Sequence, residues 1–85
     1  MSERSNAGYI IISAIRVGDT EYVLGENSKA PARFVTWMCR NGSDYFWGRY
    51  TDDPLSALRN LLDRAGSALE ALERRQREEA GQHED

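Results

Sequence analysis

Apolar residues form two pairs of short runs before residue 51, and after it they recur every three or four positions. The first pair is Tyr9–Val17 (YIIISAIRV) and Thr20–Leu24 (TEYVL), separated by Gly18 and Asp19. β-Branched residues favour strands, and a two-residue loop that begins with glycine suits a type II′ or I′ hairpin turn. This spacing predicts the cross-strand pairs Ile15 with Tyr22, Ser13 with Leu24, and Arg16 with Glu21.

The second pair of runs predicts a second hairpin and carries six of the eight aromatic residues. RFVTWMCR and YFWGRY flank Asn41-Gly42, the dipeptide most typical of a tight hairpin turn. Strict alternation divides the first strand into Val35, Trp37 and Cys39 against Phe34, Thr36 and Met38. It divides the second strand into Phe46, Gly48 and Tyr50 against Tyr45, Trp47 and Arg49. We expect Gly48 to make room for the bulky side chain of Trp37.

After residue 51 the apolar spacing becomes that of a helix. Asp53 can cap the free N–H groups, while Pro54 takes the first helical position, where its missing donor costs nothing. The apolar positions that follow have a 3-4-3-4-3 spacing: Leu55, Leu58, Leu62, Ala65, Leu69 and Leu72. This stripe is about 27 Å long, as is a strand of about eight residues. We therefore expect the sheet to cover the stripe, so that a coiled coil through this helix is not required.

These patterns together predict an α+β fold. It consists of a four-stranded antiparallel meander (ββββα) with one C-terminal amphipathic helix packed on one face. Short connections between neighbouring strands favour the spatial order 1-2-3-4. We expect residues 9–79 to form the single domain, and the polar segments 1–8 and 80–85 to be disordered tails.

One helix covers only one face of such a sheet, yet both predicted faces are apolar. In the first hairpin, Ile11, Ile15, Tyr22 and Leu24 point to one side, and Ile10, Ile12, Ala14 and Val23 to the other. An antiparallel sheet with one solvated face alternates more cleanly, and a large exposed apolar patch commonly marks an interaction site. The uncovered face is therefore predicted to be an interface, with the candidate residues Phe34, Met38, Tyr45, Trp47, Arg40 and Arg49. The alternative is that the N-terminal tail or the loop Gly25–Ala32 folds over this face.

The residue composition argues against several kinds of catalytic and metal site. The single cysteine, Cys39, forms no disulfide or thiolate metal site within the chain and fits a reducing cytoplasm. The only histidine, His83, lies in the expected tail, and helix capping explains Asp52 and Asp53 better than paired catalytic carboxylates do. No phosphate-binding loop, nucleophile motif or metal signature is present. No run is long enough to span a membrane. We expect a protein that is not an enzyme and needs no cofactor.

The leading functional hypothesis is a small interaction module that forms a homodimer through the aromatic sheet face, since symmetric self-association is the commonest case. A second possibility is that a different protein binds this same surface. The alternative is a nucleic-acid-binding accessory protein, in which exposed aromatic rings beside Arg33, Arg40 and Arg49 stack on single-stranded bases. The net charge of −3 weighs against nucleic acid, because phosphate contacts normally require a basic surface.

Four short motifs carry a resemblance: VG-x-x-E, the K-A-P loop, TW-x-C-x-NG, and YFWG-x-Y, which together span residues 15–50. Over this stretch the chain resembles small uncharacterised proteins carried on conjugative and other mobile elements of gut bacteria. The resemblance implies a bacterial mobile-element context. It implies no particular activity and no catalytic residue.

Overall fold

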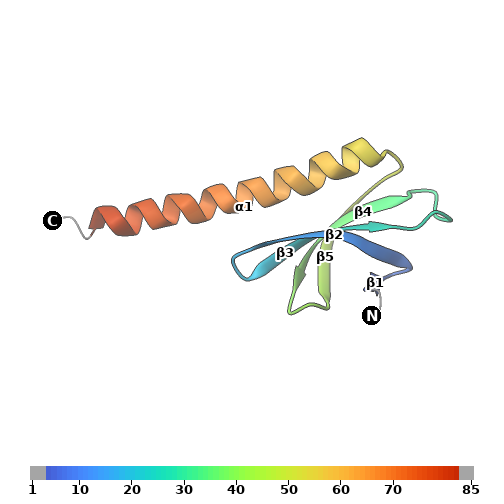
Figure 1. The fold of residues 1–85 in the computed structure, drawn as a ribbon, viewed down its shortest axis with the longest axis horizontal. Coiled ribbons are helices and arrows are strands. Elements are labelled where there is room, and N and C mark those ends of the chain that lie inside the picture. Colours follow the sequence, from blue (N-terminus) through green and yellow to red (C-terminus); the bar gives the residue numbers. More distant parts are fainter. Residues whose placement is uncertain (1–3, 83–85) are drawn as a thin grey trace.

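The computed structural model describes residues 4–82, with side chains from residue 4 to residue 79. Five strands form one antiparallel sheet in the order β1-β2-β3-β4-β5, and a single helix follows (Figure 1). The elements are β1 (Ser5–Asn6), β2 (Tyr9–Val17), β3 (Thr20–Glu26), β4 (Phe34–Arg40), β5 (Asp44–Thr51) and α1 (Pro54–Gln82). The predicted α+β class and meander order are confirmed, but the sheet has five strands where four were expected.

The additional strand, β1, lies within the segment that we expected to be a tail. Ser5 pairs with Ile10 and Asn6 with Tyr9 across a two-residue loop. Both loop residues, Ala7 and Gly8, have positive φ, as a type I′ turn requires. The polar sequence of this segment has no strand period, so the tail gave no sign of it. Residues 1–3 and 83–85, including His83, lie outside the described residues, and α1 continues through residues 80–82.

The first predicted hairpin is confirmed at its turn. Ile15 pairs with Tyr22, Ser13 with Leu24, and Arg16 with Glu21, around a loop in which Gly18 alone has positive φ. A β-bulge between Ile11 and Ser13 then shifts the register. The expected face assignment is wrong beyond this point: Ile11 lies opposite Gly25 and packs with Val23, on the other face from Ile15. A bulge adds one residue to one strand, which reverses the alternation of everything past it.

The second hairpin has the predicted Asn41-Gly42 turn, with positive φ at both residues. Here too a bulge interrupts alternation: Trp37 stands opposite two residues, Trp47 and Gly48. Phe46 and Arg49 therefore share a face with Met38 and Thr36, rather than lying on opposite faces. The predicted role of Gly48 is confirmed, because a Cβ there would lie 2.7 Å from Nε1 of Trp37.

The helix begins as predicted. The carboxylate of Asp53 accepts hydrogen bonds from the backbone N–H (3.1 Å) and the hydroxyl (2.6 Å) of Ser56. These are the bonds of an N-cap residue, and Pro54 is the first helical residue. From here α1 crosses the sheet and extends well beyond it (Figure 1). Among residues 4–82 no helix has the length and apolar character that crossing a membrane requires.

The side of α1 that contacts the sheet differs from the predicted one. The buried helix residues are Ala57, Leu61 and Ala65, and they pack with Tyr22, Leu24 and Phe34 of the sheet. Five leucines that we expected the sheet to cover are exposed: Leu55 (73%), Leu58 (44%), Leu62 (53%), Leu69 (50%) and Leu72 (38%). The sheet already supplies large rings on this face, and the helix packs against them with two alanines and one leucine rather than with these five leucines.

Candidate functional site

The face of the sheet away from α1, here called the inner face, is filled by the protein itself. Its buried residues are Tyr9, Val23, Val35, Trp37 and Cys39. The sheet curls so that the ring of Trp37 packs against those of Tyr9, Tyr45 and Tyr50, with centroids 5.5–6.3 Å apart. Partly buried Ala30 from the loop after β3 adds to this cluster, and the hydroxyl of Tyr9 donates to the carbonyl of Ala32. The expected open apolar face is therefore largely closed, mainly by the curl of the sheet and partly by the loop, although Tyr50 on this face stays 55% exposed.

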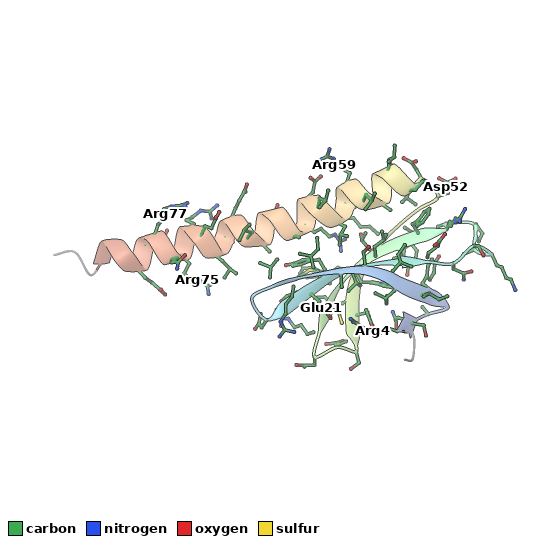
Figure 2. The ribbon with its side chains drawn as sticks, viewed as in Figure 1. Arg4, Glu21, Asp52, Arg59, Arg75 and Arg77 are labelled. Carbon is green, nitrogen blue, oxygen red and sulfur yellow. The ribbon has the colours of Figure 1, made fainter. Side chains whose placement is uncertain are left out.

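Arg4, from the segment expected to be a tail, closes one end of the inner face. Its guanidinium donates to both carboxylate oxygens of Glu21 (3.0 and 3.1 Å) and to the hydroxyl of Tyr45 (3.1 Å). These hydrogen bonds raise the pKa of Arg4. Arg4 and Glu21 lie together on the side of the sheet away from α1 (Figure 2). No signal in the sequence pointed to this contact, since a single arginine in a polar segment has no period.

Cys39 is a free thiol with 1% of its surface exposed, in the buried cluster of the inner face. Burial raises its pKa, and the nearby charge of Arg4 opposes that rise. Within the described residues, no three His, Cys, Asp or Glu side chains lie close enough together to hold a metal ion.

The six candidate interface residues do not form one surface. Phe34 is buried under α1, and Met38 is partly buried beside the same cluster. Tyr45 is partly buried on the inner face. Arg40 is exposed and lies over the ring of Phe46, with 5.8 Å between guanidinium and ring centroid. Only Trp47, Arg49 and Met38 come together, at a cleft described below.

The largest exposed apolar feature of α1 is the set of five leucines named above, here called the leucine stripe. At about 100° per helical residue, its centre lies roughly 80° around the helix from the residues that face the sheet. The stripe therefore runs along the side of α1, next to the sheet but not under it. Leu72 lies above the turn between β2 and β3, where a Cβ on Gly18 would come within 3.4 Å of it. Beyond Leu72 the described side chains of α1, residues 73–79, are all polar and exposed.

The opposite side of α1 forms a cleft with β5, here called the arginine cleft, with a volume of about 620 Å³. Tyr22 and Met38 line it from the sheet, Trp47, Gly48 and Arg49 from β5, and Asp63, Arg64, Ser67 and Ala68 from α1. Arg64 makes one long hydrogen bond, 3.5 Å, to the carbonyl of Thr36. Burial lowers the pKa of Arg64, and the neighbouring charge of Arg49 lowers it further.

Comparisons with protein families, curated proteins and solved structures found no match for this chain. Function must therefore be argued from these two surfaces, the leucine stripe and the arginine cleft. The spacing of the leucines predicted the stripe, but we expected it to be part of the core. Trp47 and Arg49 were candidate residues, but their proximity to Arg64 was not predicted, because Arg64 follows them by 15 or more residues along the chain.

Proposed function

We propose that this protein is a small interaction module, without enzymatic activity, that forms a homodimer through the leucine stripe of α1. The observation that carries the proposal is the exposure of five leucines at 3-4 spacing on a helix whose other apolar side is already buried. Contiguous exposed apolar patches are uncommon on monomers and usually mark an interface. The proposal keeps the homodimer predicted from the sequence but moves its contact from the sheet to the helix.

The occupant that fits the stripe best is a second copy of the same stripe. Leu55, Leu62 and Leu69 fall at the a positions of a heptad repeat and Leu58 and Leu72 at d positions, while Ala65, the d residue between them, is buried against the sheet. Helices with this pattern pair by inserting a and d side chains between those of a partner. A stripe of about 27 Å is short, so we expect a weak dimer with a Kd of roughly 1–100 μM.

The position of the sheet favours a parallel pair. Since the sheet lies to one side of the stripe, two-fold symmetry in a parallel pair places the two sheets on opposite sides of the paired helices. An antiparallel pair with the same leucine layers places both sheets on the same side and at the same height, where they collide. In the parallel pair, the flanking e and g positions set Arg59 beside Pro54 of the second copy. Like charges therefore do not meet.

Sedimentation over a concentration series tests the dimer. Wild type is expected to shift from monomer to dimer between micromolar and near-millimolar concentration. Leu62→Glu and Leu69→Glu are expected to stay monomeric at every concentration, because a carboxylate in an a layer is buried without a partner. Both side chains are half exposed in the protomer, so the variants should keep their fold.

Matched controls separate this proposal from its rivals. Ala71→Glu places the same charge on the exposed opposite side of α1 and is expected to dimerise normally. Trp47→Arg, which would break a dimer through the sheet aromatics, is also expected to dimerise. Leu55→Cys is expected to form a disulfide between copies on oxidation, since position 55 faces itself only in a parallel pair. A wild type that remains monomeric throughout would overturn the proposal, as would a dimer unaffected by both glutamate variants.

The nucleic-acid alternative has less support from the fold. Of the candidate aromatic rings, Phe34 and Tyr45 are turned into the two cores, and Trp47 alone stays exposed. Arg33 forms an ion pair with Glu26 at 2.6 Å. The arginine cleft is accessible to an anionic ligand.

A further inference from the structure

We infer that the arginine cleft is a binding site for a phosphorylated planar ring, the chemistry of a nucleotide. The inference is independent of the leucine stripe, because the two features lie on different sides of α1. It rests on three observations: an uncompensated pair of guanidinium groups, an exposed aromatic ring held in an unfavourable backbone conformation, and a cleft of ligand size.

The guanidinium groups of Arg49 and Arg64 lack a counter-charge. Within the described side chains, residues 4–79, neither forms an ion pair. Asp63 lines the same cleft, but its carboxylate lies 3.9 Å from Arg59 and carries one charge against two. Arg64 is partly buried and donates to the carbonyl of Thr36 at 3.5 Å, but within the described side chains its positive charge has no negative partner. An anion between the two arginines would supply that partner, and a phosphate accepts several of their N–H donors at once.

Trp47 provides the ring. It is 71% exposed at the edge of the cleft, although large aromatic side chains are usually buried. Its φ of 57° places it in the left-handed region, which is costly for a bulky residue and which a glycine would occupy without cost. Backbone conformations of this kind gather at ligand sites. Here the bulge turns the indole out of the sheet, where a planar ligand can stack on it.

The cleft has the size and lining of a small-ligand site. Its volume of about 620 Å³ lies within the range of roughly 300–1,000 Å³ typical of small-molecule pockets. Met38 and Ala68 supply apolar surface, and Ser67 and Tyr22 supply hydroxyl groups. A nucleotide fills such a cleft with its base on Trp47 and its phosphate at the two arginines.

Calorimetric titration with AMP, adenosine and inorganic phosphate tests the inference. AMP is expected to bind at sub-millimolar concentration, and adenosine and phosphate each at least about 30-fold more weakly, because each supplies half of the contacts. Arg49→Gln, at an exposed position, is expected to abolish the advantage of AMP over adenosine. Trp47→Gly is expected to abolish the tighter binding of AMP relative to phosphate. The Tm of this variant is expected to equal or exceed that of wild type.

Two controls and one further ligand complete the design. Arg75→Gln removes an exposed arginine far along α1, and Leu62→Glu breaks the proposed dimer; both are expected to bind AMP as wild type does (Figure 2). A short oligothymidylate is the further ligand. If it binds more tightly than AMP and this binding is lost in Arg49→Gln, the phosphorylated ring that the cleft binds belongs to a single strand rather than to a free nucleotide. No binding of AMP, phosphate or oligothymidylate at millimolar concentration would overturn the inference. So would binding that is unchanged in both Arg49→Gln and Trp47→Gly.

Discussion

At the scale of single residues, Arg4 connects segments that are distant in sequence. It comes from a polar segment near the N-terminus and contacts side chains on β3 and β5. Its Nη2 also lies 3.6 Å from Sγ of Cys39, at the end of the buried inner cluster. The arginine therefore pairs with the carboxylate of Glu21 at the point where the apolar interior meets water.

We predict that Arg4→Met lowers the free energy of unfolding by about 1–2 kcal/mol, because Glu21 loses its bidentate partner at a partly buried site. A double-mutant cycle with Glu21→Gln, measured by urea unfolding, should give a coupling energy of about 1 kcal/mol. As a control, Arg59→Met breaks an exposed pair with Asp63 and should change the stability by less than about 0.5 kcal/mol. Additive effects of the two inner-face substitutions would contradict the pairing.

At the scale of elements, two β-bulges and one choice of helix side decide the arrangement. The bulge in β2 moves Ile11 to the inner face, and the bulge in β5 turns Trp47 outward. Small residues bring α1 close to the sheet and leave its leucines on the outside. Glycine has opposite roles in these elements: Gly48 gives space to Trp37, whereas a Cβ on Gly66 would contact nothing within 4 Å.

The two glycines give a paired prediction. Gly48→Ala should destabilise the protein by about 1–3 kcal/mol, because the new methyl group overlaps the indole of Trp37 and the ring of Tyr50. Gly66→Ala should stabilise it by about 0.5–1 kcal/mol, because alanine favours the helix and meets open space. Chemical denaturation of both variants tests this. Equal effects of the two substitutions would refute the packing argument.

The start of α1 gives a prediction about pH. Hydrogen bonds from the hydroxyl and then the N–H of Ser56 lower the pKa of Asp53. A carboxylate whose pKa is lowered in the folded state stabilises the fold above its unfolded-state pKa, near 4, and loses that effect as the pH falls through its folded-state pKa. Asp53→Ala should therefore reduce the Tm at neutral pH, and the difference from wild type should shrink at about pH 2.5.

Thermal melts followed by circular dichroism measure this difference. Asp52→Ala is the matched control, because within the described residues the carboxylate of Asp52 accepts no hydrogen bond. A difference between wild type and Asp53→Ala that stays constant with pH would exclude a charged cap.

At the scale of the whole molecule, the protein is elongated, with extents of 58 × 27 × 20 Å, because α1 projects past the sheet (Figure 1). The curled sheet closes one core around Trp37, and the helix closes a second one on the other face. The two remaining surfaces, the leucine stripe and the arginine cleft, lie on different sides of one helix. A dimer and a bound ligand can therefore coexist, so the experiments on each surface are independent.

Local patterns were sufficient for most of the fold. The Asn41-Gly42 turn, the pairing around Gly18, the cap at Asp53 and the space at Gly48 all depend on neighbouring residues, and the sequence predicted each of them. The candidate site was predicted less well. Trp47, Arg49 and Met38 meet at the cleft, but Phe34 and Tyr45 point into the two cores. Alternation along a strand cannot locate a bulge, and a single bulge reverses every assignment beyond it.

The sequence by itself therefore determined four of the five strands, the helix, their turns and their order, since these follow from local backbone preferences and apolar period. Only the tertiary structure decided which side of the helix is buried, how the sheet curls over its own aromatic rings, and which arginines come together. Those outcomes depend on the fit of side chains that are distant in sequence, and period alone does not encode that fit.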